Sequence, residues 1–343
     1  MQGRGKEVAE LWLEVIERAR HQGSGAAFTR IAQYLERGPT HWSAKYSCGD
    51  EVGVWQACLD ICRENLPSGH AARVSLLRVI AACHFAAGAF GAAESSALAA
   101  YDEGVSNPSP EARQVLELIR WLVRLYCRTG QSEQAVEWCA DYENWLGRLE
   151  SDAAATMRLA AGDMYTELGR YDLAEQHLAA ALSHRVSVYG ERDPYALVLP
   201  ARIGCIRLAQ GRLDEAETVF HQVLGKLQAV SNVALVRGYS DDLWKLACKL
   251  VRARIEQGEL AAAETLARKA LASIDRTQSR DAAFMKSLLG EALRQRGALV
   301  EAESLLLAAY AELRDRLGPA FQREAGAVAA HLVGLYEAWH AAA

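Results

Sequence analysis

The chain has 343 residues, of which 51% are hydrophobic and 24% charged, with a formal net charge of −5. This composition is typical of a folded protein, and the lack of a basic excess argues against nucleic-acid binding. With only 7 prolines and no alternating runs of β-branched residues, the chain is expected to be all-α. The longest mildly apolar run, residues 79–93, is shorter than the roughly 20 residues of a membrane span.

The first part of the chain predicts helices without a clear repeat. Residues 5–20 are expected to form a helix with one apolar side, which consists of Val8, Leu11, Trp12, Val15 and Ile16. Residues 26–36 and 52–65 are interpreted as a degenerate first repeat, and residues 38–50 between them are the most loop-like segment of the chain. No apolar leader segment precedes the first helix, so we expect a cytoplasmic protein.

From residue 71 onward a short pattern recurs, Gly-x-φ-x-x-Ala, in which φ is usually apolar. Its copies are separated by 42, 39, 42, 47 and 39 residues and begin at Gly88, Gly130, Gly169, Gly211, Gly258 and Gly297. In five copies the Ala is followed by a glutamate: Glu94, Glu175, Glu217, Glu264 and Glu303. Seven residues before the glycines stand mostly small residues: Ala81, Val123, Gly162, Gly204, Val251 and Gly290.

Each copy predicts two helices joined by a turn. The glycine readily adopts the positive φ that ends the first helix, and the small residues let the second helix pack closely against it. A helix pair of this size buries its apolar face only by stacking on similar pairs. The sequence therefore predicts an array of helical repeats.

The six copies resemble the tetratricopeptide repeat, and their spacing near 42 residues resembles the longer variety found in kinesin light chains and many bacterial proteins. Residues 189–194 are similar to the Gly-x-x-His-Pro link of that variety, with Asp193 in place of His. Asp193 and Ser109 are also expected to cap helices that begin at Pro194 and Pro110.

Two positions depart from the family pattern. Arg207 and Arg254 stand where the family usually has an aromatic residue, as Tyr126 and Tyr165 do. The 47-residue spacing implies an insertion near residues 229–241. The resemblance implies a right-handed α-solenoid in three parts: N-terminal helices and a degenerate repeat at 1–70, six repeats at 71–318, and a C-terminal capping helix at 319–343.

The sequence contains no motif of a phosphate-binding loop, a zinc protease or a serine hydrolase. The densest group of soft metal ligands is Cys58, Cys62, His70 and Cys83. Four such ligands suit tetrahedral zinc, but their spacing matches no zinc module, and cysteine is common in helical cores. Packing is the favoured interpretation. We expect no metal, no cofactor and no catalytic activity.

In tetratricopeptide arrays the first helix of each pair lines a concave groove that holds ligands. Alignment on the turn glycines predicts a peptide-binding groove formed by Arg78, Phe85, Arg120, Arg124, Arg128, Asp163, Thr166, Arg252 and Arg294. Arg120, Arg124 and Arg128 lie four residues apart and form a cationic stripe that an acidic peptide would neutralise. The alternatives are solvation of these arginines or pairing with Glu94, Glu117, Glu133 or Glu137.

The sequence thus predicts a non-catalytic scaffold or adaptor that binds a protein or peptide, with neither nucleic acid nor membrane as partner. Its oligomeric state stays open. One alternative is a regulatory subunit or tail of a larger enzyme, because residues 287–339 are similar to repeat arrays that follow bacterial serine/threonine kinase domains. The other is a sensor of a small ligand or signal peptide. Co-purification distinguishes the three.

Overall fold

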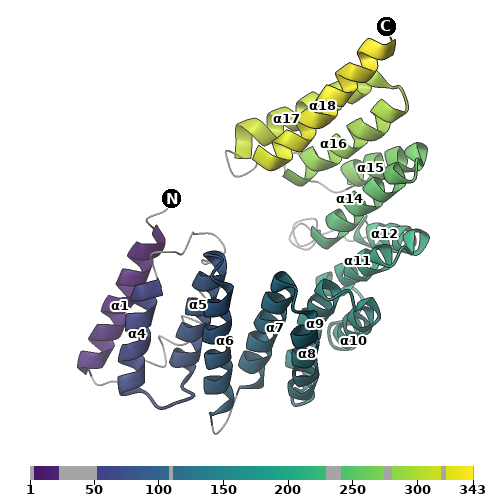
Figure 1. The fold of residues 1–343 in the computed structure, drawn as a ribbon. Coiled ribbons are helices and arrows are strands. Elements are labelled where there is room, and N and C mark those ends of the chain that lie inside the picture. The colour runs from purple at the N-terminus through teal and green to yellow at the C-terminus, as the bar shows by residue number, and fades with distance from the viewer. Residues whose placement is uncertain are drawn as a thin grey trace. The chain divides into compact units, whose positions relative to one another are not determined.

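The computed structural model describes residues 4–22, 52–107, 111–228, 241–273, 280–317 and 322–342. Every regular element in these ranges is an α-helix, which confirms the all-α prediction. The chain divides into two compact units, Met1–Arg170 and Tyr171–Ala343 (Figure 1).

The first unit contains the helices α1 (Arg4–Gln22), α4 (Val52–Asn65), α5 (Ala71–Ala86), α6 (Phe90–Val105), α7 (Ala112–Thr129), α8 (Ser132–Leu146) and α9 (Ser151–Glu167). Helices that follow one another pack side by side from α4 to α8, and α7 also packs on α9 (Figure 1). The core at its beginning joins α1, α4 and α5, and Ile16, Leu59 and Leu76 are fully buried there.

The first helix buries less of its apolar side than the sequence predicted. Ile16 is buried and Trp12 is partly buried, whereas Leu11 and Val15 are 61% and 46% exposed. The side chain of Val8 lies outside the described residues. Helix α1 contacts α4, so the buried strip is narrower than the apolar side of the helix.

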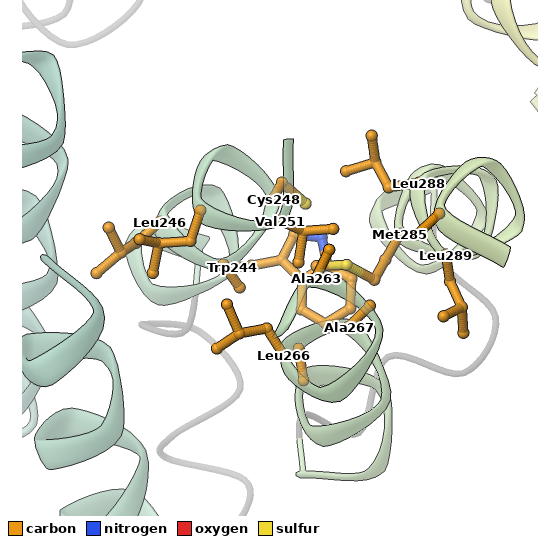
Figure 2. Packing of buried hydrophobic residues seen from close by; sticks show 14 of the residues in the cluster. Trp244, Leu246, Cys248, Val251, Ala263, Leu266, Ala267, Met285, Leu288 and Leu289 are labelled. Atoms are coloured by element: carbon orange, nitrogen blue, oxygen red, sulfur yellow. The ribbon is translucent and has the colours of Figure 1, made fainter. Parts of the chain in front are cut away.

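The second unit contains the helices α10 (Tyr171–Tyr189), α11 (Pro194–Ala209), α12 (Leu213–Gln228), α14 (Asp241–Glu256), α15 (Leu260–Ser273), α16 (Arg280–Gln295), α17 (Leu299–Leu317) and α18 (Gln322–Ala342). One continuous core runs from α11 to α18. Figure 2 shows its middle, where Trp244 of α14, Ala263 of α15 and Met285 of α16 meet.

All six predicted turns share one backbone geometry. The six glycines have φ between 70° and 84°. In each turn the backbone amide of the residue after the glycine donates a hydrogen bond to the carbonyl of the residue four positions before the glycine, at 2.8 to 2.9 Å. This hydrogen bond, which spans six residues, gives a donor to a carbonyl that the end of the helix would otherwise leave unpaired. The helices that end at these turns are here called the A helices: α5, α7, α9, α11, α14 and α16.

Two of the small positions show why size matters there. A Cβ on Gly204 would lie 2.7 Å from Leu246 Cδ2, and one on Gly290 would lie 2.7 Å from Leu306 Cγ. Leu246 belongs to the next A helix, and Leu306 belongs to α17, the partner of α16. The absence of a side chain therefore sets the distance between these helices.

The cap prediction for α11 is confirmed. Asp193 Oδ2 accepts the Ala196 amide at 2.9 Å, and Pro194 begins the helix. Other predictions lie outside the described residues: Ser109, Pro110, the helix at 26–36, the loop at 38–50 and the insertion near 229–241.

Candidate interaction surface

The three arginines predicted as a cationic stripe all lie on α7, and each has a partner within the first unit. Arg120 Nη2 donates to Glu117 Oε2 at 2.5 Å. Arg124 donates to Glu167 of α9 at 3.1 and 3.4 Å. The guanidinium of Arg128 lies 5.7 Å from the centre of the Phe85 ring of α5. The expected pairing with Glu117 is present, and Glu167 is a partner that the sequence did not indicate.

Phe85 belongs to a small aromatic cluster at the same place. Its ring centre lies 5.6 Å from that of Phe90 and 5.7 Å from that of Trp121, both at tilted, edge-on angles. Such edge-to-face pairs contribute about 1 kcal/mol beyond area burial. The cluster holds Phe85 in a fixed position under Arg128.

The other predicted residues of the first unit are less exposed to a partner than Arg124 and Arg128 of α7. Arg78 of α5 and Asp163 of α9 are partly buried. Thr166 Oγ1 donates to the carbonyl of Gly162 in its own helix at 2.6 Å. Within this unit the exposed predicted groups are therefore Arg124 and Arg128.

In the second unit the predicted residues lie on α14 and α16. The Arg252 guanidinium is 5.4 Å from the centre of the Phe284 ring. Arg294 donates two hydrogen bonds to Glu291, at 2.7 and 2.8 Å. Burial raises the pKa of Glu291, but hydrogen bonds from Arg294 and Gln295 outweigh burial and leave this pKa below its ordinary value.

Beside this ion pair, α18 contributes a histidine. His331 Nδ1 lies 2.9 Å from the hydroxyl of the buried Ser287. Burial lowers the pKa of His331. The negative charge of Glu291 opposes this shift, whereas the positive charges of Arg294 and Arg252 lower the pKa further. The contact joins α16 to α18.

A contact that sequence reasoning missed repeats along the array. Among the described residues, three glutamates that stand six residues after a turn glycine bind the residue four before the next turn glycine. Glu94 accepts from Tyr126 at 2.8 Å, and Glu175 accepts from Arg207 at 2.7 and 3.0 Å. This pairing is here called the inter-repeat contact. Glu264 departs from this pattern, because the corresponding residue is Leu293, and it binds Arg296 instead.

The inter-repeat contact explains the two departures from the family pattern. Arg254 donates to Glu217 at 2.6 and 3.1 Å, so an arginine performs the task that Tyr126 performs elsewhere. The second repeat has Val136 in place of the glutamate, and there Tyr165 donates to Glu143 instead, at 2.8 Å. The recurring glutamate was visible in the sequence, but its partner was not.

Comparison with known proteins agrees with this geometry. Residues 152–229 match the family model of the tetratricopeptide repeat. This segment contains tetratricopeptide repeats. The narrower assignment to the kinesin-light-chain-like variety stays a prediction. No curated protein matches the sequence.

Three solved structures are similar. BtubC (BKLC) from P. vanneervenii is 17% identical, with a TM-score of 0.51 over 67% of this chain and 93% of that one. The apo form of RapI is 12% identical, with a TM-score of 0.52 over 98% and 97%. A STAND signal transduction ATPase with a tetratricopeptide repeat sensor, from Pyrococcus horikoshii, is 14% identical, with a TM-score of 0.50 over 97% and 53%. At these identities the likenesses show the fold.

The cysteine cluster considered for zinc lies in the core that joins α1, α4 and α5. Cys58, Cys62 and Cys83 are buried. Burial raises the pKa of Cys58 to about 12 and that of Cys62 to about 11. His70 caps α5, because its Nδ1 accepts the Ala72 amide at 3.2 Å. Among the described residues, no group of three or more His, Cys, Asp or Glu side chains is placed to hold a metal.

No described helix of the repeats combines the length and the apolar character that crossing a membrane requires.

Proposed function

We propose that this tetratricopeptide-repeat protein is a non-catalytic scaffold or adaptor that binds a partner protein or peptide on its A helices. One observation carries the proposal: α7 presents two exposed arginines, Arg124 and Arg128, next to the aromatic cluster of Phe85, Phe90 and Trp121. Arginines and aromatic side chains dominate the binding energy of protein interfaces.

The pairing on α7 favours a partner that carries carboxylates. The Arg124 and Glu167 side chains are 53% and 41% exposed, so their ion pair contributes at most about 1 kcal/mol. A carboxylate of a partner can displace Glu167 at a small cost and form a two-point contact with the guanidinium. Arg128, held over Phe85, needs no rearrangement to accept a second carboxylate.

The test compares capture of partners from cell extract by the wild type and by an Arg124→Gln/Arg128→Gln variant. An Arg113→Gln/Arg148→Gln variant removes the same charge from exposed positions and is the control. Arg113 lies in the first turn of α7, about three turns before Arg124, and Arg148 follows α8. We expect a partner that the wild type and the control capture, that the α7 variant loses, and that cross-links to α7. Equal capture by all three proteins contradicts the proposal.

The second candidate is a sensor or regulatory part of a larger enzyme. It is favoured by the similar STAND ATPase, whose tetratricopeptide repeats are a sensor and of whose length this chain covers 53%. Native mass spectrometry of the purified protein distinguishes the candidates. A retained small molecule supports the sensor, and a co-purified enzyme supports the regulatory part.

A further inference from the structure

Helices α17 and α18 share an exposed apolar surface in the second unit. They pack side by side (Figure 1), and the Tyr336 hydroxyl of α18 donates to Glu303 of α17 at 2.7 Å. Among the described residues of these two helices, the exposed large hydrophobic side chains are Val300, Leu307, Val333 and Tyr336, which are 47% to 72% exposed. We call the surface formed by these four residues the α17–α18 seam.

The seam is one continuous patch around the bond between Tyr336 and Glu303. Val300 and Leu307 stand three residues before and four residues after Glu303, so they lie on its side of α17. Val333 stands three residues before Tyr336, so it lies on that side of α18. The four apolar side chains therefore gather where the two helices meet.

The outer side of α18 carries few charges. The exposed residues among those described on this helix are Gly326, Ala327, Ala330, Val333, Tyr336, Glu337 and His340. By contrast, the exposed residues described on α1 include Glu10, Glu14, Glu17, Arg18 and Arg20. An outer helix of a repeat array that borders water needs a polar face. The composition of α18 is instead that of a helix that packs on another helix.

The order of small and large residues along α18 fits a second α18 as the occupant. Residues 325–330 consist of Ala, Gly and the buried Val328, and a Cβ on Gly326 would have nothing within 4 Å. The large exposed residues Val333 and Tyr336 follow in the second half of the helix. In an antiparallel pair of α18 helices, the large residues of each helix lie against the small residues of the other.

One register satisfies this fit on both sides of a two-fold axis. An axis midway between residues 331 and 332 places Val333 opposite Ala330 of the second copy, and it places Tyr336 opposite residues 325–329. The same contact is then made twice, as a two-fold interface requires. Gly and Ala at the contact let the two helix axes approach to about 8 Å, the short end of helix packing distances.

The seam is also large enough for a reversible dimer. Helix α18 has 21 residues and is therefore about 31 Å long. Together with α17, whose axis lies about 8–10 Å away, it presents a face about 20 Å wide. Two such faces bury about 1,200 Å² in total, which is the lower limit of stable specific interfaces.

A lipid surface is a poorer occupant of the seam. Helices that lie on membranes carry Lys and Arg beside their apolar side, and the exposed residues described on α18 include neither. A second copy requires no cation, because its fit depends on shape.

We propose that two copies of this chain associate through the α17–α18 seam, with α18 antiparallel to α18 of the second copy and with Val333 and Tyr336 of each copy resting on residues 325–330 of the other. The proposal goes beyond the scaffold function, because it assigns a second interaction surface that needs no binding on α7.

The first test measures molecular mass by sedimentation equilibrium at protein concentrations from about 1 μM to about 1 mM, the range in which weak interfaces associate. We expect a monomer–dimer equilibrium. A Val333→Glu variant is expected to raise the dissociation constant at least about tenfold, because each dimer would then take two carboxylates out of water. Val188→Glu is the matched control, since Val188 on α10 is 53% exposed and Val333 is 57% exposed, and it should leave the dissociation constant unchanged.

An Ala330→Phe variant tests the register. It adds apolar surface to α18 but fills the space that Val333 of the second copy needs, so we expect weaker dimerisation through overpacking. Unspecific association of an apolar face predicts a tighter dimer instead. Tighter or unchanged dimerisation of this variant therefore contradicts the proposal. Thermal unfolding followed by circular dichroism checks that all variants are folded.

Other occupants of the seam give distinct results. A wild type that stays monomeric over the whole concentration series overturns the proposal, whether or not it captures another protein or binds phosphatidylserine vesicles through Val333. A Val188→Glu control that dissociates as strongly as Val333→Glu overturns it as well. The Arg124→Gln/Arg128→Gln variant is expected to dimerise like the wild type, so the proposals for the seam and for α7 can fail separately.

Discussion

The inter-repeat contact at Arg254 predicts a measurable dependence of stability on one side chain. Arg254 is only 13% exposed and donates to Glu217, Asp214 and Glu259 at 2.6 to 3.1 Å. The Glu217 carboxylate is itself 22% exposed, whereas Asp214 and Glu259 are 91% and 51% exposed. The ion pair with Glu217 is therefore expected to contribute most of the stabilisation that Arg254 provides.

An Arg254→Met substitution keeps the length of the side chain and removes all its donors. It leaves the carboxylate of Glu217 partly buried without its main partner, which costs about 1.5–3 kcal/mol. The two exposed carboxylates add little, since exposed pairs contribute about 0–1 kcal/mol. We expect the free energy of unfolding of the second unit to fall by about 2 kcal/mol in urea titrations followed by circular dichroism.

An Arg254→Tyr substitution separates this reasoning from a general effect of mutation. Tyr126 makes the same contact with Glu94 in the first unit, so a tyrosine at 254 is expected to recover at least half of the loss. Arg268, 45% exposed and paired with two carboxylates, is the control, and Arg268→Met is expected to cost less than about 1 kcal/mol. If Met and Tyr at position 254 are equally destabilising, or if neither is, the reasoning is refuted.

Three more predictions concern helix packing and pH. Gly290→Ala is expected to destabilise the protein by about 1–3 kcal/mol through overpacking. Gly225→Ala, which places a Cβ with nothing within 4 Å of it, should stabilise the protein by about 0.5–1 kcal/mol. Urea titration measures both changes. Burial raises the pKa of Asp193, but hydrogen bonds from Arg185 and a backbone amide outweigh it and hold the pKa below its ordinary value. The stabilisation by Asp193 is therefore present above pH about 4 and lost on acidification. Asp193→Asn should lower the free energy of unfolding by about 1–2 kcal/mol at pH 7 and by nearly nothing well below pH 4. A difference between variant and wild type that stays the same at low pH would be inconsistent with this. Because the pKa of His331 is lowered in the fold, its neutral form stabilises the protein above pH about 6.5 and stability falls as the pH drops through the lowered pKa; melting temperatures between pH 7 and pH 5 should fall less in His331→Gln than in the wild type.

The repeat positions were predictable from the sequence because local chemistry determines them. Each turn has a glycine, and an alanine stands five residues later. The glycine is needed for the positive φ that all six turns adopt, and the small alanine is needed for close packing of the two adjoining helices. The alanines that follow, such as Ala93 and Ala216, are fully buried. These features depend on residues close together in the chain.

The candidate surface was predictable only in part, because it depends on contacts between helices. Periodicity placed Arg120, Arg124 and Arg128 on one side of α7, but it does not say that Glu167, 43 residues after Arg124, reaches that side. In the same way, spacing does not reveal that Glu143 replaces the missing glutamate at position 136. Such partners are set by the register between neighbouring helices, which no single segment encodes.

The chemistry of the inter-repeat contacts also has a mechanical consequence. Salt screens an ion pair between exposed or half-exposed groups and affects a hydrogen bond from a neutral phenol less. The contacts at Arg207 and Arg254 are ion pairs between side chains that are only 13% to 27% exposed, and those at Tyr126 and Tyr165 are phenol-to-carboxylate bonds. Because these ion pairs are partly buried and the other contacts come from neutral phenols, salt weakens neither kind strongly, and the stiffness of the array at these contacts is expected to change little with ionic strength.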